Sequence, residues 1–415
     1  MTGQAAAHIP ELKIPLARSA EPVSCPQDLR GTRILVVMPS IPVLGMERAN
    51  LQIMTMMRER GADVLFVVNA LPGEKVAREV ERIGFAWAAA PVTERPRIPR
   101  TPQEGFALMA AWAKGARAIS RIYREYRPTH IHLTSLAYVL YAAPTLLGAR
   151  SHVVFRLPNP PDRHLSRRKR AVSNALWRRI VDPLCDTIVC NSRFSYEELC
   201  ATGLQGGKLK IIHNCVAGRP SGINRDAPTL DPAHFNIVFV GQLTPAKGIE
   251  ALLCAARDLV GEHGEMRFYL AGWRSPYAEG LARDIEDRGL GSSIRFIGEI
   301  EDVLGLLAKA DLHVCPSIFE DPFPNVVLEA KSQGVPSVVF SSGGIPELVR
   351  HGVDGYVCAE KTADALRQGI LYFLRDRDAL RSAGDAARQS LTRFSPERIS
   401  SQWAAVFHAS GVPSE

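Results

Sequence analysis

The stretch LHVCPSIFEDPFPNVVLEA, residues 312–330, contains the pattern on which the fold depends. A short apolar run, Leu312–Pro316, leads into a loop with Pro322 and Pro324, and a segment of helical period follows. The apolar run predicts a buried strand, and the two prolines favour an extended loop. Asn325 stands where a helix cap is expected. The stretch therefore predicts one strand–loop–helix unit.

The same alternation of a short apolar run and a longer segment of helical period recurs along the chain. Runs rich in β-branched residues that alternate with helical segments are typical of α/β proteins with doubly wound parallel sheets. The expected strands are Ile34–Met38, Asp63–Val68, His130–Leu133, His152–Leu157, Thr187–Asn191 and Lys210–His213 in the first half, and Asn236–Val240, Arg267–Ala271, Ile294–Ile297, Leu312–Pro316, Ser337–Phe340 and Tyr356–Cys358 in the second.

The chain has 415 residues, more than one hydrophobic core usually serves, so we expect two domains. A Pro- and Asp-rich stretch without apolar period, GRPSGINRDAPTLDPAH, separates the two sets of strands. The prediction is two Rossmann-like domains facing a cleft, because open parallel sheets bind ligands beyond the carboxyl ends of their strands. The expected segments are a flexible tail at 1–30, a first domain at 31–218, a linker at 219–234, a second domain at 235–394 and a C-terminal helix at 395–415 that packs back on the first domain.

Composition is ordinary for a globular chain, with 46% hydrophobic and 22% charged residues and a formal net charge of +7. The excess of cations suits nucleotides or acidic lipids, and we expect no nucleic-acid partner. The eight cysteines include no C-x-x-C pair, which fits a reducing compartment. We find no secretory apolar core and no run near the roughly 20 apolar residues of a membrane helix. We expect a cytoplasmic protein, soluble or bound peripherally to the inner membrane.

A glycine-containing turn follows the predicted strand Asn236–Val240. It runs as GQLTPAK from Gly241 to Lys247, and a helical pattern starts near Ile249. Backbone N–H groups and the positive end of a helix attract anions, and Lys247 adds a mobile cation, so the turn suits a diphosphate. An ordinary βα loop with a solvated lysine is the alternative interpretation.

Two carboxylates lie eight positions apart in the opening stretch, Asp321 in the loop and Glu329 early in the helix. Both are expected at the carboxyl end of the sheet, where carboxylates accept hydrogen bonds from sugar hydroxyls. A second glycine turn, Gly343–Gly344, follows the strand Ser337–Phe340 and offers N–H donors to a phosphate. Two solvated charges are the alternative for the acidic pair.

Together these motifs resemble the family-four retaining glycosyltransferases of the GT-B fold, the glycosyl transferases group 1. The resemblance spans nearly the whole chain after the tail and is weaker in the first half. The matching segments are VFVGQLTPAKGIE, FIGEI, the opening stretch and GGIPELVRHGVDGYV in the second half, and PSIPVLGMERANLQIMTMMRERGADV, DTIVCNSRFSYEELCATGL and KIIHNCV in the first.

The resemblance implies which residues hold the donor. Lys247 matches the lysine that grips the donor diphosphate, and Gln242 replaces the arginine that assists it. Of the family's two glutamates, the second, which holds the ribose hydroxyls, matches Glu329. The first, which binds the donor sugar, matches Asp321, with Glu320 as an alternative.

Further positions match other contacts of the family. The turn Gly298, Glu299 and Ile300 takes the place of the nucleobase contact, and the backbone of Asn325 and Val326 matches groups near the sugar and phosphate. On the acceptor side, Gly45 matches a glycine of the N-terminal turn, and Arg156 stands nearest a histidine position of many relatives. The implied catalytic residues are Asp321, Lys247 and Arg156, and the implied donor site also includes Gly241, Gln242, Gly343 and Gly344.

The implied reaction is a retaining transfer of a sugar from a nucleotide-sugar donor to a glycan or lipid-linked acceptor, with no metal or other cofactor required. The first domain would then face the acceptor and the second the donor. Two alternatives stay open. One is a nucleotide-sugar epimerase. The other is a non-catalytic sugar-nucleotide-binding protein, which would explain why Gln242, Asp321 and Arg156 depart from the family pattern. An oxidoreductase is disfavoured because no G-x-G-x-x-G follows the first strand.

Three other features are weaker signals. The D-x-D text from Asp376 to Asp378 lies in a charged helical segment, where solvated charges are expected rather than a metal site. His130 and His132 are expected to be half-buried strand residues rather than ligands. A basic run surrounds an apolar helical pattern, which suits an anionic membrane or a lipid-phosphate acceptor, with a solvated face as the alternative. Its members are Arg163, Arg167, Arg168, Lys169, Arg170, Arg178 and Arg179.

Overall fold

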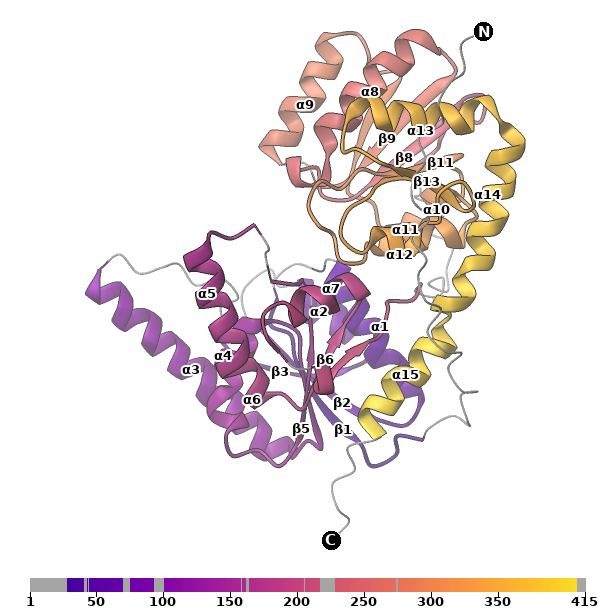
Figure 1. Ribbon diagram of the computed structural model, residues 1–415. Coiled ribbons are helices and arrows are strands. Elements are labelled where there is room, and N and C mark those ends of the chain that lie inside the picture. The colour runs from indigo at the N-terminus through magenta and orange to yellow at the C-terminus, as the bar shows by residue number, and fades with distance from the viewer. Residues whose placement is uncertain are drawn as a thin grey trace.

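The computed structural model describes residues 28–40, 43, 45–69, 75–92, 101–157, 159–161, 164–204, 206–216, 228–273 and 275–408. These residues form two α/β domains, the N-terminal one below and the C-terminal one above in Figure 1, each built on a parallel sheet. Two Rossmann-like domains are confirmed. Most of the predicted tail and linker lies outside the described residues.

The N-terminal sheet has seven strands within the described residues, in the order β3-β2-β1-β4-β5-β6-β7. β1 is central, and its Val36 lies opposite Phe66 on one side and His132 on the other. The strands are mostly apolar because helices cover both faces of a parallel sheet. They are β1 (Arg33–Val37), β2 (Asp63–Val68), β3 (Ala86–Ala89), β4 (His130–Leu133), β5 (His152–Arg156), β6 (Thr187–Cys190) and β7 (Leu209–Ile211).

The helices of this domain alternate with its strands. A π-helical turn, Trp177–Val181, connects two of them, and a 3-10 turn, Gly206–Lys208, precedes the last strand. The helices are α1 (Gly45–Glu59), α2 (Lys75–Arg82), α3 (Pro102–Tyr126), α4 (Leu136–Leu146), α5 (Arg167–Leu176), α6 (Asp182–Leu184) and α7 (Arg193–Cys200).

The C-terminal sheet has six strands in the described part of the chain, in the order β10-β9-β8-β11-β12-β13. The strands are β8 (Phe235–Val240), β9 (Met266–Ala271), β10 (Ile294–Gly298), β11 (Leu312–Cys315), β12 (Ser337–Phe340) and β13 (Gly355–Cys358). The helices are α8 (Ile249–Glu262), α9 (Pro276–Asp287), α10 (Val303–Leu307), α11 (Asn325–Ser332), α12 (Ile345–Leu348), α13 (Ala363–Arg375), α14 (Arg377–Ser390) and α15 (Pro396–His408), with 3-10 turns at Pro245–Lys247 and Leu391–Phe394.

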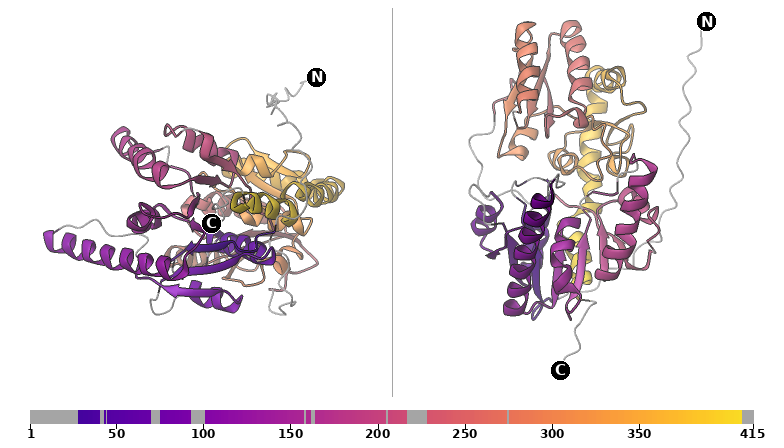
Figure 2. Two further views of the ribbon diagram at one scale, coloured as in Figure 1. Left: turned by 90° about the horizontal axis from the view of Figure 1, so that it is seen from below. Right: turned by 90° about the vertical axis from the view of Figure 1, so that its left-hand side faces the viewer.

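The last helix, α15, leaves the C-terminal domain and lies against the N-terminal one (Figures 1 and 2). Trp403 and Phe407 join the core between α1 and the N-terminal sheet, and Trp403 is fully buried. The Trp403 ring packs edge-on against His132, with centroids 5.6 Å apart. The chain therefore passes between the domains twice, once after β7 and once after α14.

The strands differ from the sequence predictions mainly at their ends. The strand expected at Lys210–His213 is Leu209–Ile211, and the ends of the other predicted strands differ by at most one residue. β3, with the sequence AWAA, was missed because it lacks β-branched residues and forms an edge of the sheet. Asn214, which follows β7, contacts both Arg156 at the end of β5 and Asn325 at the start of α11, so the carboxyl ends of the two sheets meet between the domains.

Candidate active site

The turn after β8 and the loop after β11 are joined at the carboxyl end of the C-terminal sheet. Phe319 donates its backbone N–H to the carbonyl of Ala246 at 2.9 Å. Gly248 has a φ of 72°, and an added Cβ would lie 1.8 Å from the carbonyl oxygen of Pro316, so this contact requires glycine. The contact holds Lys247 against the loop that carries the acidic residues.

Lys247 and Asp321 form an ion pair, with the Nζ of Lys247 donating to the Oδ2 of Asp321. The Asp321 side chain is only 11% exposed. Burial lowers the pKa of Lys247, but the Asp321 carboxylate more than offsets that effect, so the pKa lies above its usual value. Lys247 therefore stays a cation, and an ammonium group with three protons can serve a second acceptor.

Glu320 is held away from this pair by Lys361, which precedes α13. The Nζ of Lys361 donates to the Oε1 of Glu320 at 3.2 Å and to the Oγ of Ser342 at 3.1 Å. The Oε2 of Glu320 accepts the N–H of Gly343 at 2.5 Å. Asp321 thus pairs with Lys247, and its neighbour Glu320 pairs with Lys361. Lys361 was not predicted, because it lies outside every motif recognised in the sequence.

The glycine turn after β12 supports the acidic loop. Gly344 donates its N–H to the carbonyl of Asp321 at 2.9 Å, and Gly343 donates to Glu320. An added Cβ on Gly344 would lie 1.9 Å from the carbonyl oxygen of Pro322. In this conformation these N–H groups are therefore not the free phosphate donors that the sequence predicts.

Glu329 lies one turn into α11 and is half-buried, and Val326 packs partly against the domain core in the first turn of the same helix. Burial raises the pKa of Glu329, while Arg48 of the N-terminal domain opposes the shift. Within the described part of the chain, the Glu329 carboxylate has no hydrogen-bond or ion-pair partner. A poorly solvated carboxylate without donors favours a ligand that brings hydroxyl groups.

Asn325 joins the two domains. Its Oδ1 accepts a hydrogen bond from Asn214 at 2.6 Å, and its Nδ2 donates to the carbonyl of Gly45 at 3.2 Å. Asn214 in turn accepts from the Nη2 of Arg156 at 2.8 Å. The predicted helix cap is wrong, because Pro324 is the N-cap residue and no side chain caps α11. The Asn325 side chain is used between the domains instead.

Arg156 lies at the end of β5 and is only 3% exposed. Burial lowers its pKa to about 10, and the charge of Glu47 in α1 opposes that shift. Among the described residues, the guanidinium group is linked to the start of α11 through Asn214 and Asn325. Arg156 thus lies behind Asn214 and Asn325, on the side away from the acidic loop.

The other predicted donor residues follow β8 and β10, which flank β9. The carbonyl of Gly298 accepts the N–H of Gly272 at 2.8 Å, and this bond holds the turn after β9 beside the turn after β10. Gln242 is exposed. Trp273 follows β9 between these turns and is 61% exposed, and the sequence analysis missed it. The residues that line this end of the sheet are Gly241, Gln242, Gly298, Glu299 and Ile300.

A second contact between the domains centres on Glu347 in α12. Its carboxylate accepts the N–H groups of Arg193 and Phe194, at 2.8 and 2.9 Å, at the start of α7. The Nε2 of His213 lies 3.4 Å from the same carboxylate. A carboxylate is stabilised at a helix N-terminus by free N–H groups and the helix dipole. Glu347 thus fastens the C-terminal domain to α7.

The weaker signals of the sequence have structural roles. His130 and His132 are more deeply buried than predicted, and burial lowers their pKa values to about 4 and 3, so both rings are neutral. Asp376 caps α14, accepting the N–H groups of Asp378 and Ala379 at 3.1 and 2.8 Å. No group of three or more His, Cys, Asp or Glu in the described ranges could hold a metal ion.

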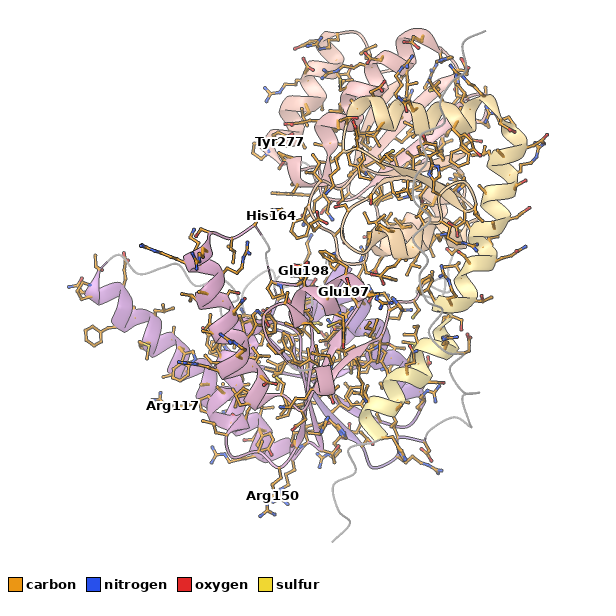
Figure 3. All side chains as sticks on the ribbon, viewed as in Figure 1. Arg117, Arg150, His164, Glu197, Glu198 and Tyr277 are labelled. Carbon is orange, nitrogen blue, oxygen red and sulfur yellow. The ribbon has the colours of Figure 1, made fainter. Side chains whose placement is uncertain are left out.

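The basic run forms α5, which has no buried residue, and the π-helical turn after it. Trp177 in that turn is buried against Phe155, so the amphipathic pattern is shorter than predicted. Arg163 lies outside the described residues. Figure 3 labels His164, just before α5 of the lower domain, and Tyr277 of α9 in the upper domain.

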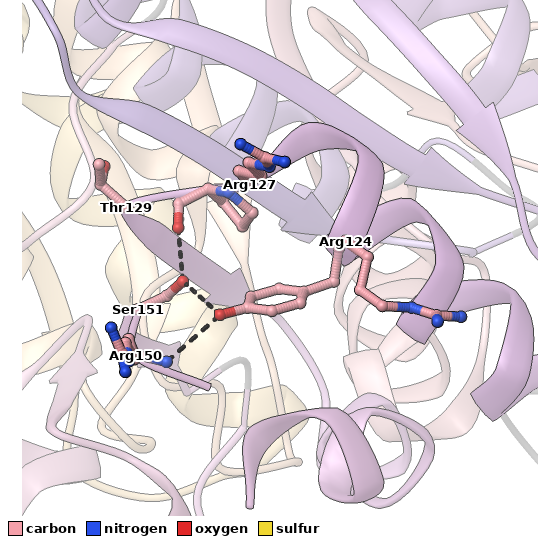
Figure 4. A pocket seen from close by; sticks show the side chains of 7 residues that line it. Arg124, Arg127, Thr129, Arg150 and Ser151 are labelled. Atoms are coloured by element: carbon pink, nitrogen blue, oxygen red, sulfur yellow. Dashed lines mark hydrogen bonds between the residues drawn. The ribbon is translucent and has the colours of Figure 1, made fainter. Parts of the chain in front are cut away.

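A surface hollow lies far from this region, at the amino ends of β4 and β5 (Figure 4). The Tyr123 hydroxyl accepts the N–H of Arg150 at 3.3 Å and the Oγ–H of Ser151 at 3.2 Å. Figure 4 shows that the side chains of Arg124, Arg127 and Arg150 point in different directions. They do not converge on one ligand, and the hollow contains no predicted site residue.

Two parallel-sheet domains whose carboxyl ends face one another define the GT-B class of glycosyltransferase folds. A family model described as "Glycosyl transferases group 1" matches residues 223–390, and one described as "Glycosyltransferase Family 4" matches residues 43–217. Together they account for both domains. The chain belongs to the group 1 glycosyltransferases.

Individual relatives and solved structures agree with this assignment. An exopolysaccharide phosphotransferase of Streptomyces coelicolor is 31% identical over 49% of this chain and 21% of its own length. The N-acetyl-alpha-D-glucosaminyl L-malate synthase of Bacillus anthracis is 36% identical over 30% of this chain and 31% of its own. The matches thus span less than half of these two relatives.

The crystal structure of Anabaena HepE in complex with UDP and glucose is similar in fold. Its TM-score is 0.74 at 22% identity, and the match covers 91% of this chain and 100% of that one. At this identity the similarity shows the GT-B fold alone.

Proposed function

We propose that the chain transfers a sugar, with retention, from a nucleotide-sugar donor to a glycan or lipid-linked acceptor. The observation that carries the proposal is that the ammonium group of Lys247 and the carboxylate of Glu329, which has no partner among the described residues, lie at the carboxyl end of the same sheet, between the domains. Lys247 stays charged beside Asp321, and Glu329 offers its carboxylate within the next helix. A nucleotide sugar matches both groups, because it carries a diphosphate and ribose hydroxyls.

In the proposed reaction the bond from the sugar's anomeric carbon to the donor diphosphate breaks. The acceptor hydroxyl oxygen bonds to the same face of that carbon, and its proton passes to the departing diphosphate oxygen. Lys247 stabilises the charge that develops on the diphosphate, and no metal or cofactor is invoked. Asp321 holds the sugar, and Arg156 and Asn214 fix the loop through Asn325.

The donor-site proposal predicts that Lys247→Ala and Glu329→Ala each lower turnover about 100-fold or more, because both act directly on the donor. Release of nucleoside diphosphate from a set of nucleotide sugars with a crude acceptor extract measures turnover. Circular dichroism checks the fold. The matched controls are Lys75→Ala and Glu59→Ala, at exposed positions of the N-terminal domain.

Full activity in both site variants would contradict the assignment of the donor site. Conversion of the donor sugar to its epimer, without nucleotide release, would favour the epimerase alternative. Nucleotide-sugar binding by the wild-type chain with neither product would favour a non-catalytic binding protein.

We also propose that the protein works at the cytoplasmic face of an anionic membrane, which α5 contacts peripherally. α5 has no acidic residue, and its cations Arg167, Arg168 and Lys169 are exposed. Each cation near an anionic surface contributes about 1 kcal/mol. Seven unpaired cysteine thiols among the described residues suit a reducing compartment. None of the helices in that part of the chain has the length and hydropathy to span a bilayer.

A further inference from the structure

The first half of α3 projects beyond the body of the N-terminal domain (Figures 1 and 2). The buried residues of this helix all lie between Gly115 and Ile122. Before them runs the apolar sequence FALMAAW, residues 106–112, in which Phe106 is 78% and Met109 is 60% exposed. Large apolar side chains that gather at an exposed helix end mark an interaction surface.

Cations continue the same outward face of α3. Phe106, Ala110, Ala113, Arg117, Arg121 and Arg124 follow one another at spacings of three or four residues, so they form one stripe along the helix. The stripe is apolar in its first half and basic in its second. Beside it lies a hollow of about 620 Å³, whose lining includes Trp112 and Pro144 next to the arginines.

α5 projects from the same side of the domain as α3 (Figure 1). Its side chains Arg167, Arg168 and Lys169 are exposed, and they form no ion pair with another described residue. Val172, in the middle of α5, is 63% exposed. Two helices on one side therefore both combine exposed cations with exposed apolar side chains.

We propose that the outward face of α3 inserts into an anionic bilayer, with Phe106 and Met109 at the acyl boundary and the arginines of the stripe at the phosphates. Interfacial helices bury their apolar face about 5–10 Å deep. Phe106 and Arg117 are eleven residues apart, about 17 Å along a helix, so an oblique α3 places them at these two levels. A second copy of the chain is a poorer occupant, because its own cations would face these cations.

The proposal extends the α5 membrane contact proposed above and is independent of the donor site. Its test is co-sedimentation of the full chain with vesicles of phosphatidylcholine, alone or mixed equally with phosphatidylglycerol. Phe106→Ser with Met109→Ser is expected to weaken binding to the mixed vesicles about tenfold at both low and high salt. Arg168→Gln with Lys169→Gln is expected to weaken it mainly at low salt.

Matched controls keep the comparison specific. Val353→Ser with Tyr372→Ser removes exposed apolar side chains from the C-terminal domain, and Arg295→Gln with Arg375→Gln removes the same charge there. Both controls, and Lys247→Ala, are expected to bind vesicles as the wild type does. Circular dichroism confirms that each variant is folded.

The outcomes separate the two membrane proposals. If only the Arg168 and Lys169 variant loses binding, the α5 contact stands and the insertion of α3 is wrong. If the wild-type chain ignores anionic vesicles at low salt, both are wrong. A wild-type dimer in solution that the Phe106 and Met109 variant converts to a monomer would also overturn the proposal, in favour of a second copy on this face.

Discussion

At the scale of single residues, the environment of Glu329 opposes the charge of its carboxylate. Burial raises its folded-state pKa above the usual 4.5, so the folded state gains stability from the protonated carboxyl. This gain is fully present below the unfolded-state pKa and is lost as the pH rises through the folded-state pKa. At neutral pH the ionised carboxylate therefore reduces stability.

Glu329→Gln keeps the size of the side chain and removes the ionisable group. We expect the variant to unfold at a higher temperature than the wild type at pH 7, with the difference shrinking towards pH 4. Its affinity for a nucleotide sugar is expected to fall about tenfold, because a neutral amide accepts weaker hydrogen bonds than a carboxylate. Calorimetry and isothermal titration measure the two effects.

Glu59→Gln, at an exposed position of α1, is the matched control and is expected to change neither property. A Glu329→Gln variant that melts lower at pH 7 and binds the donor as before would contradict this account of the site.

The recognised motifs predicted which residues gather at the site, but not the individual partner of each side chain. The grouping of Lys247 with Asp321 follows from two loops at the ends of adjacent strands, and a direct ion pair is a small step further. Lys361, the partner of Glu320, lies outside every recognised motif, and Asn214, the partner of Asn325, lies in the matching segment KIIHNCV, for which no contact was predicted. Spacing along the chain contains no information on such pairs.

At the scale of elements, the contact between α12 and α7 holds the domains together. Glu347→Ala removes two charge-assisted hydrogen bonds to the N–H groups of Arg193 and Phe194. Hydrogen bonds to charged groups contribute about 1.5–3 kcal/mol each. Without them, the arrangement in which α7 contacts the C-terminal domain is expected to become less populated. We expect faster hydrogen exchange at these two amides, a larger radius of gyration in solution scattering and about tenfold lower turnover.

The control for this prediction is Glu197→Ala, which removes a carboxylate that pairs with Arg193 inside α7, at 3.0 Å. It leaves the contact between the domains intact, so exchange at the two amides should stay slow. Unchanged exchange in Glu347→Ala would show that other contacts hold α7 against the C-terminal domain.

Elements were predicted best where their hydrophobic pattern is strong. β2, β4 and β12 have the predicted bounds. β2 and β12 are mainly apolar runs, and β4, with the sequence HIHL, alternates histidine with apolar residues. β3 was missed because its AWAA sequence suits a helix as well as a strand. It is a strand because it pairs with β2, a contact that the sequence pattern does not predict. Helix starts depend on local capping contacts, which is why Asn325 was wrongly assigned as a cap.

At the scale of the whole molecule, the N-terminal domain depends on the last helix of the chain. Trp403 on α15 is fully buried in that domain, with Phe407 stacked 6.0 Å away. Trp403→Ala is expected to cost about 3–5 kcal/mol, as for other buried aromatic side chains. The loss should appear as weaker hydrogen-exchange protection of β1 and β4, while the C-terminal sheet stays protected.

The control here is Tyr372→Ala, on α13 of the C-terminal domain, where the side chain is 41% exposed. It should leave protection of the N-terminal sheet unchanged. If Trp403→Ala weakened both sheets equally, the two domains would unfold as one unit and the dependence would not be specific to α15.

The return of α15 also sets the order in which a newly made chain can reach its final state. The ribosome completes the strands of the first domain by residue 211, but the helix that closes its core ends at residue 408. At about 5–20 residues per second, the first domain waits roughly 10–40 seconds for that helix. The second domain is fully synthesised before then, so the half of the protein that is made first is the half that finishes folding last.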